Sequence, residues 1–95
     1  MKPKVGTILT LEPTYTETAE KFRCKVVEEK ENVILIDYPT NTLTKRTSFL
    51  IEGAQMRASF VEDAKAAYAF QTEVLGRVQG QIPMIMLSFP GNDQV

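Results

Sequence analysis

The chain has 95 residues, which is enough for one small domain and too short for most large enzyme architectures. Its hydrophobic content of 43%, charged content of 24% and net charge of −1 are typical of a soluble globular domain, and they exclude the broad positive charge of most nucleic-acid-binding proteins. The sequence contains no histidine, so it cannot build a Ser-His-Asp or Cys-His pair or supply histidine ligands to a catalytic zinc ion.

Cysteine usage and the N-terminal sequence indicate a reducing compartment. Cys24 is the only cysteine, so an internal disulfide and a multi-cysteine metal site are excluded. We interpret Cys24 as a core residue rather than a reactive thiol, because no histidine is present to activate it. The first residues lack the apolar core of a signal peptide, and no run approaches the roughly 20 apolar residues of a membrane helix. We therefore expect a cytoplasmic protein without membrane insertion.

Apolar residues recur with period two along most of the chain, which predicts strands rather than helices. A first strand is predicted over residues 6–11, ending before Pro13 because proline cannot donate to a ladder. A second strand is predicted over residues 19–29. One face of it is apolar, and the other carries a basic stripe made of Lys21, Arg23 and Lys25.

The polar segment 28–32 predicts a hairpin turn, followed by a strand over residues 33–38. The apolar stretch of this strand is continuous rather than alternating, so we expect it to be covered on both faces. Residues 39–47 combine proline, asparagine and several threonines, which favour turns. They form the longest polar loop in the sequence, and Lys45 and Arg46 lie near its tip.

The next segments predict a hairpin and a wider connection. A short strand at 49–51, closed by Glu52-Gly53, is expected to pair with a strand over 54–62. Residues 62–67 fit either one helical turn or a wide hairpin loop. The loop is favoured by the alternating strand that follows over residues 68–75.

Two glycines interrupt the C-terminal pattern. Gly76 and Gly80 bracket three residues and indicate a bulge or a tight barrel corner. The last strand is predicted over residues 82–89, with Pro83 near its start, where an edge position tolerates proline. Seven strands with short connections predict an all-β fold, namely a small antiparallel barrel that is closed or nearly closed.

Two surfaces leave alternatives open. Met84 and Met86 lie on the opposite face of the last strand from Ile85 and Leu87. If the latter pair fills the core, the two methionines sit outside and could cover a partner domain or a dimer contact, whereas the alternative is a strand buried on both faces. The basic stripe fits either phosphate contacts, as in small nucleic-acid-binding barrels, or an ordinary solvated strand face.

Several short groups of residues, in a fixed order along these strands, carry a family resemblance. They are Tyr38-Pro39, Thr44-x-Arg46-Thr47 and Ile82-Pro83-Met84-Ile85-x-Leu87-x-x-Pro90, together with Val5-Gly6-x-x-Leu9-x-Leu11 and Phe70-x-x-x-Val74-x-Gly76-x-Val78. Over nearly its whole length the chain resembles the N-terminal (PilZN, or YcgR-like) domain of the flagellar-brake (YcgR/YpfA-like) cyclic-di-GMP receptors. The resemblance implies a split β-barrel of about six to seven strands over residues 1–90, with residues 91–95 at the start of a linker.

The resemblance also implies a function. In that family the linker carries an Arg-x-x-x-Arg signature and leads to a PilZ domain, and the two bind cyclic-di-GMP together. This chain contains neither that signature nor an Asp/Asn-x-Ser-x-x-Gly motif, so no ligand-binding, catalytic, cofactor or metal residue is assigned to it. The implied role is a non-catalytic regulatory domain that controls flagellar motility. Its implied partners are the PilZ domain of its own chain and flagellar motor proteins of the stator or rotor, and a homodimer is a further option.

Four residues are candidate interface groups: Lys45 and Arg46 on the polar loop, and Met84 and Met86 on the last strand. For the two cations the alternatives are a solvated turn or a structural arginine that bonds loop carbonyls. Two other functions compete with the implied one. A flavin-binding split barrel needs a phosphate-binding cluster that is not evident in the sequence, and a small nucleic-acid-binding β-barrel is disfavoured by the net charge.

Overall fold

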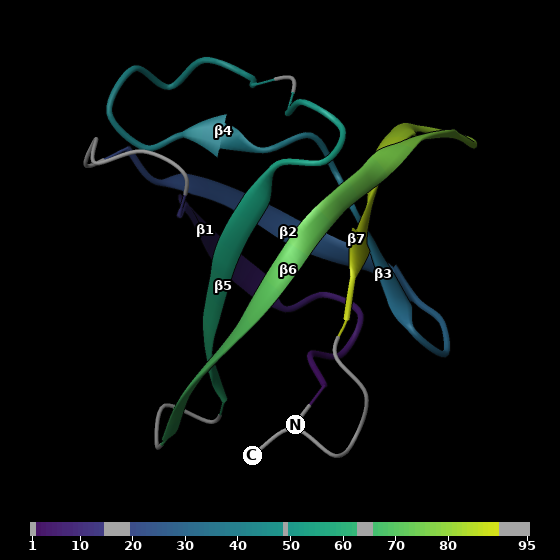
Figure 1. The fold of residues 1–95 in the computed structure, drawn as a ribbon, viewed down its shortest axis with the longest axis horizontal. Helices are drawn as coiled ribbons and strands as arrows, with labels where there is room; N and C mark the ends of the chain where they lie inside the picture. Colours follow the sequence, from purple (N-terminus) through teal and green to yellow (C-terminus); the bar gives the residue numbers. More distant parts are fainter. Residues whose placement is uncertain (1, 15–19, 49, 63–65, 90–95) are drawn as a thin grey trace.

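The computed structural model describes residues 2–14, 20–48, 50–62 and 66–89, and the structural statements below refer to these. The described residues form seven strands and no helix (Figure 1). The strands are β1 (Ile8–Pro13), β2 (Phe22–Glu29), β3 (Val33–Ile36), β4 (Thr40–Asn41), β5 (Gln55–Glu62), β6 (Ala66–Gln79) and β7 (Pro83–Ser88).

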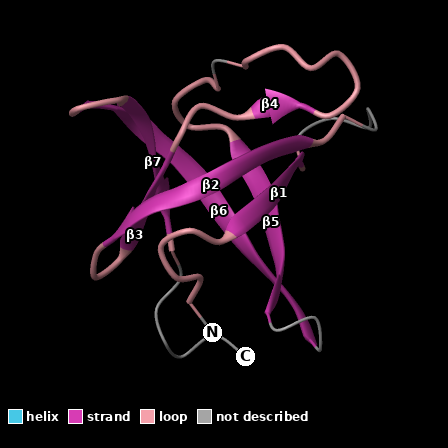
Figure 2. Cartoon of the chain, turned by 180° about the vertical axis from the view of Figure 1, so that it is seen from behind, coloured by secondary structure: helices cyan, strands magenta, loops and turns pink. Residues whose placement is uncertain are grey.

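Six of the strands close into an antiparallel barrel. Their order is β1-β5-β6-β7-β3-β2, and β2 pairs back onto β1 to complete the circle (Figures 1 and 2). The short strand β4 is an addition to the N-terminal end of β2, where Asn41 pairs with Phe22. The expected all-β barrel of six to seven strands is therefore confirmed.

The barrel is split because β2 and β6 each take part in two sheets. The first half of β2 pairs with β1 and its second half with β3, while β6 pairs first with β5 and then with β7. The register shifts at both changes of partner, between Val26 and Glu28 and between Val74 and Gly76. Gly76 has a φ of 153°, so the predicted bulge at this glycine is confirmed.

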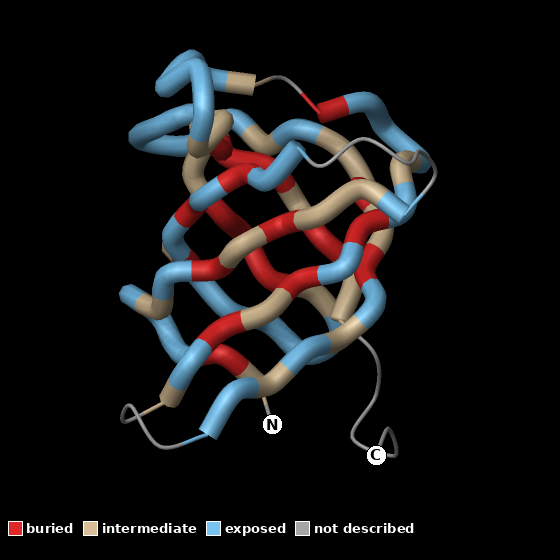
Figure 3. Tube along the Cα trace, turned by 90° about the vertical axis from the view of Figure 1, so that its left-hand side faces the viewer, coloured by how far each residue is buried: buried red, intermediate tan, exposed pale blue. Residues whose placement is uncertain are grey.

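Buried residues recur along the strands of the barrel (Figure 3), and their side chains form one hydrophobic core. Cys24 is 5% exposed and belongs to this core, as predicted. Thr72 is buried among apolar residues, and its hydroxyl donates to the carbonyl oxygen of Ser88 at 2.6 Å, which satisfies both groups. The core comprises Leu9, Leu11, Phe22, Cys24, Val26, Ile34, Ile36, Leu50, Met56, Ala58, Phe60, Val74, Ile85 and Leu87.

The predicted strand at 49–51 and its pairing with 54–62 are wrong. Leu50 and Ile51 lie outside all strands, and Phe49 is outside the described residues. The segment instead turns at Gly53, which has a φ of 91° and whose amide donates to the carbonyl of Val74 at 2.7 Å. Leu50 is buried in the core, whereas Ile51 is 75% exposed, so Leu50 packs onto the barrel without forming a ladder.

The first strand also differs from its prediction, since it continues through Pro13. Thr14 donates its amide to the carbonyl of Gln55, so the residues of β1 that direct hydrogen bonds at β5 are the even-numbered ones. Pro13 pairs with Met56 at a position that needs no donor. The missing N–H of this proline therefore costs the ladder nothing.

The other strands occupy the predicted segments with shifted ends, and the largest shift is in β6, which begins at Ala66 and continues through Gly76 to Gln79 instead of covering residues 68–75. The short strand β4 lies within residues 39–47, where only a loop is predicted, so that prediction is wrong at Thr40 and Asn41.

The hairpin after β2 is confirmed, with the amide of Lys30 donating to the carbonyl of Val33 at 2.9 Å. β3 is buried on both faces as expected, because Ile34, Leu35 and Ile36 are all buried. The predicted connection 62–67 joins two paired strands, whose last pair is Glu62 with Ala66, and residues 63–65 lie outside the described part.

Candidate interface surfaces

The loop that carries Lys45 and Arg46 is anchored to the barrel at both of its ends. Thr40 pairs with Arg23 of β2 and forms an isolated bridge with Thr47. The amide of Ser48 donates to the carbonyl of Pro39 at 2.7 Å. The loop therefore leaves and rejoins the barrel at one place, which limits its freedom to move relative to β2.

Asn41 organises the tip of this loop. Its side-chain oxygen accepts hydrogen bonds from the amides of Leu43 at 2.8 Å and Thr44 at 3.0 Å. Its backbone is held as well, because its amide donates to the carbonyl of Arg46 and its carbonyl accepts from the amide of Lys45. Lys45 adopts a left-handed conformation with a φ of 66°. The asparagine thus replaces hydrogen bonds that a regular strand would supply.

The tip presents one apolar and two cationic side chains to solvent. Lys45 and Arg46 are both exposed, and Leu43 is 76% exposed. The sequence pattern predicted the two cations as interface groups but not Leu43. An apolar residue between two threonines in a polar loop is the sequence feature that could have indicated its exposure. The arrangement can bind a partner through an apolar contact surrounded by charge-assisted hydrogen bonds.

The two methionines of β7 lie in different environments. Met84 is 8% exposed, and its Cε lies only 2.7 Å from where a Cβ on Gly80 would sit. The turn after β6 therefore covers this side chain. At Met84 the strand is buried on both faces, which is the second of the two predicted alternatives. Met86 is half-buried and lies in register with the buried Leu35 of β3.

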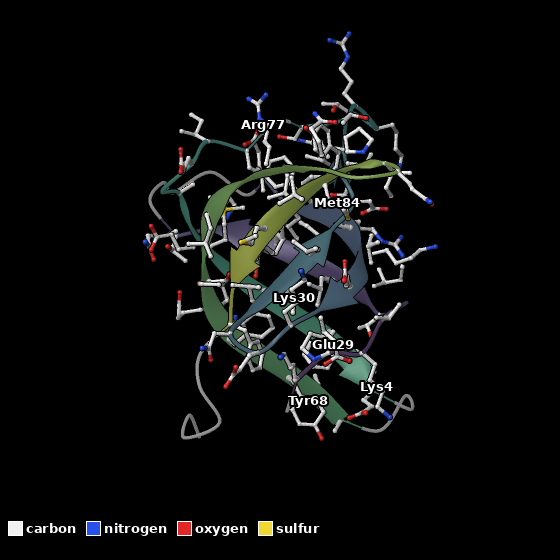
Figure 4. All side chains as sticks on the ribbon, turned by 90° about the vertical axis from the view of Figure 1, so that its right-hand side faces the viewer. Lys4, Glu29, Lys30, Tyr68, Arg77 and Met84 are labelled. Carbon is white, nitrogen blue, oxygen red and sulfur yellow. The ribbon has the colours of Figure 1, made fainter. Side chains whose placement is uncertain are left out.

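The structure does not bring the two pairs of candidate residues into one site. The loop of Lys45 and Arg46 extends from β4, which pairs with β2, whereas Met84 and Met86 lie on β7, between β3 and β6. Figure 4 shows Met84 on the side of Arg77, with Lys4 toward the other end of the barrel and Lys30 between them. The loop and the β7 methionines are thus separate candidate surfaces.

The basic stripe of β2 is exposed as expected, and Lys21 lies 3.9 Å from Glu12. The buried Cys24 behaves differently, because burial and, to a smaller extent, the negative charge of Asp37 hold the pKa of its thiol far above the usual range. A neutral, enclosed thiol is a poor nucleophile.

The described residues contain no group of three or more cysteine, aspartate and glutamate side chains placed to hold a metal ion. Within the same ranges, no helix is long and apolar enough to span a membrane.

The family model described as flagellar protein YcgR (PilZNR) matches residues 4–90 of the chain. This match extends over nearly the whole barrel, and the chain belongs to this family, the N-terminal domain of YcgR-like flagellar proteins.

Two relatives from Bacillus subtilis are similar to this chain. The protein YpfA of strain 168 is 27% identical over 92 residues, which is 97% of this chain and 42% of YpfA. The solved structure of the inhibitor of motility MotI/DgrA has a TM-score of 0.85 and 27% identity, covering 96% of this chain and 44% of that one. The chain therefore spans less than half the length of either relative.

Proposed function

We propose that this chain is a non-catalytic regulatory domain of a cyclic-di-GMP-responsive flagellar brake, acting in the cytoplasm to control motility. The observation that carries the proposal is the match of the YcgR family model over residues 4–90, and the likeness to a structure titled an inhibitor of motility supports it. The absence of histidine and the enclosed state of Cys24 fit a domain that acts by binding rather than by catalysis.

In the proposed mechanism the dinucleotide is held by a linker and a PilZ domain of the parent protein, outside this chain. Binding there changes the angle between two rigid barrels and so changes which surface of this domain meets the motor. The loop tip of Leu43, Lys45 and Arg46 is the surface offered to a stator or rotor protein. The half-buried Met86 on β7 is the proposed contact for the PilZ domain. This domain binds no cofactor, nucleic acid or membrane in the proposed role.

The proposal that cyclic-di-GMP binds outside this chain is tested by isothermal titration calorimetry of the dinucleotide into residues 1–95 and into the parent protein. We expect no binding heat for residues 1–95 and binding by the parent. Micromolar binding to residues 1–95 alone would contradict the assignment of the ligand site to the parent's other parts.

The surface is tested by motility assays in a strain that overproduces the parent protein. The Lys45→Glu/Arg46→Glu double variant is expected to lose inhibition of swimming, because both charges of the loop tip are reversed. The matched control is Lys4→Glu/Lys30→Glu, which reverses two exposed cations that lie outside the loop (Figure 4). Equal inhibition by both double variants would rule out the loop tip as the motor-binding surface.

A further inference from the structure

A groove opens on the barrel where β1 and β5 part. Their ladder runs from Pro13 paired with Met56 to Thr10 paired with Ser59 and stops there. Beyond that point β1 stays with β2, whereas β5 continues with β6 as a hairpin that extends past the end of β1 (Figures 1 and 2). The open space between them has a volume of about 440 Å³, and its lining includes Ile8 on one wall and Val61 on the other.

The wall formed by β5 is a strand edge whose backbone N–H and C=O groups at Val61 are not paired with β1. The amide of Val74 on β6 donates to the carbonyl of Ala54, so the even-numbered residues of β5 direct their hydrogen-bonding groups at β6. The odd-numbered residues direct theirs toward β1. Val61 follows this alternation two residues after Ser59, the last residue paired with β1, and its N–H and C=O therefore point into the groove.

The wall formed by β1 has the same character. The amide of Val26 on β2 donates to the carbonyl of Thr7, so the odd-numbered residues of β1 direct their groups at β2. Ile8 directs its N–H and C=O the other way, into the groove. Two backbone edges thus face each other across a space that neither strand fills. A strand edge of this kind is a template for an added polypeptide strand.

Each wall of the groove carries an exposed apolar side chain, beside the polar residues Thr7, Thr10 and Ser59 that also line it. Val61 is 62% exposed and Ile8 is 43% exposed. Ala67, in register with Val61, and Ala69, in register with Ser59, are exposed and small, so the neighbouring sheet face is flat. Exposed apolar residues that share one groove differ from apolar residues scattered singly over a surface, which need no explanation.

The flank of the groove is basic. Lys25 lies in register with Ile8, and Arg23 lies in register with Thr10. Both are exposed, and neither forms an ion pair among the described residues. Two of the acidic groups nearby have partners, since Glu12 lies 3.9 Å from Lys21 and Asp37 accepts a hydrogen bond from the backbone amide of Lys25. A third, Glu62, follows Val61 at the end of β5.

We propose that this groove binds a short extended segment of a protein partner that carries apolar and acidic side chains. The segment pairs its backbone with the edge at Val61, covers Ile8 and Val61 with apolar side chains, and directs carboxylates toward Arg23 and Lys25. The inference deepens the proposed function and rests on it for the premise that the domain acts by contacting a protein. It adds a second surface, away from the loop tip of Lys45 and Arg46, and states the chemistry of what that surface takes.

The probe for the test is a blocked hexapeptide in which threonine separates alternating valine and glutamate residues, so that the valine and glutamate side chains share one face of the extended peptide. It is titrated into ¹⁵N-labelled residues 1–95 and followed by NMR. We expect saturable shifts at the amides of Ile8 and Val61 and slower hydrogen exchange at Val61. Two control peptides of the same length carry lysine in place of glutamate or N-methylated backbone nitrogens, and both are expected to bind more weakly. Shifts confined to other surfaces, or none at millimolar peptide, would overturn the proposal.

Variants of the chain sharpen the test. Val61→Glu is expected to lower the affinity for the valine–glutamate peptide by at least about tenfold, since it removes an apolar contact and adds a like charge. The matched control is Ile82→Glu, at an exposed apolar residue before β7, which is expected to bind as the unaltered chain does. Lys25→Glu is expected to lower the affinity for this peptide by about two- to fivefold and to raise the affinity for the lysine peptide. Unchanged affinity in Val61→Glu would also overturn the proposal.

Three further results are decisive, and the last two separate this inference from the proposed function. If sedimentation shows a dimer that Val61→Glu abolishes, the occupant is a second copy of the chain and the inference is wrong. If the parent does not affect motility but the groove binds the peptide as stated, the inference stands and the flagellar role falls. If the parent inhibits motility and the groove binds no peptide, the flagellar role stands and the inference falls.

Discussion

At the scale of single residues, Cys24 has the most perturbed chemistry in the described part of the chain. It pairs with Leu9 in the β1–β2 ladder and faces the core. Its thiol is held neutral first by burial and second by the charge of Asp37, whose carboxylate bonds the next backbone amide, that of Lys25. The residue therefore contributes to packing and couples stability to alkaline pH.

The pH dependence has a defined sign. An unfolded chain loses the Cys24 proton near the ordinary thiol pKa of 9.0, whereas the folded chain keeps it. The stabilisation from this residue is fully present below that pKa and is lost as the pH rises above it, by up to about 1.4 kcal/mol per pH unit. Urea unfolding from pH 7 to 10 should show the free-energy gap between the unaltered chain and Cys24→Ala narrowing. A constant gap would contradict the assignment.

At the scale of elements, the loop between β4 and Ser48 is specified by one side chain. Most of its hydrogen bonds involve Asn41, and the side chains at its tip point into solvent. Because few apolar contacts hold it, loss of the asparagine oxygen should loosen the loop without unfolding the barrel.

Asn41→Ala is expected to lower the free energy of unfolding by roughly 1–2 kcal/mol, because two backbone amides lose their acceptor. Hydrogen exchange should accelerate at Leu43 and Thr44 while the amides of the β5–β6 ladder keep their protection. Asn41→Asp is the matched control, since it retains a side-chain oxygen, and it should keep most of the protection. Equal exchange in both variants would contradict the capping role.

At the scale of the whole molecule, β1 closes the barrel. It pairs with β2 on one side and with β5 on the other, so the circle of strands depends on it. Its inward residues Leu9 and Leu11 are fully buried, whereas the neighbouring Ile8 is 43% exposed. A barrel with one shared core should unfold in a single cooperative transition.

Leu9→Ala is expected to lower the free energy of unfolding by about 2–5 kcal/mol, because a fully buried leucine leaves a cavity in the shared core. Ile8→Ala, the matched control, should cost less than about 1 kcal/mol. Urea unfolding followed by circular dichroism and by tyrosine fluorescence should give coincident transitions for both. Similar losses in the two variants would contradict the assigned facing of β1.

Alternation of apolar and polar residues was sufficient to place most strands and the buried faces of β2, β5 and β6. It failed for the segment 49–51, where three apolar residues were too few to distinguish a strand from an irregular segment that buries Leu50 alone among its described residues. It also left Met84 undecided, because the burial of this side chain depends on how the β6–β7 turn at Gly80 folds back over it.

The sequence by itself determined the fold class, the enclosed cysteine, the exposed basic stripe and the family resemblance, because these depend on local periodicity and on the order of short motifs. Only the tertiary structure decided where β1 and β5 part and which exposed residues share a surface. These features depend on the register between strands far apart in the chain. The groove at Ile8 and Val61 arises in this way, since each residue alone is an ordinary exposed apolar side chain, and only the divergence of their strands makes them two walls of one site.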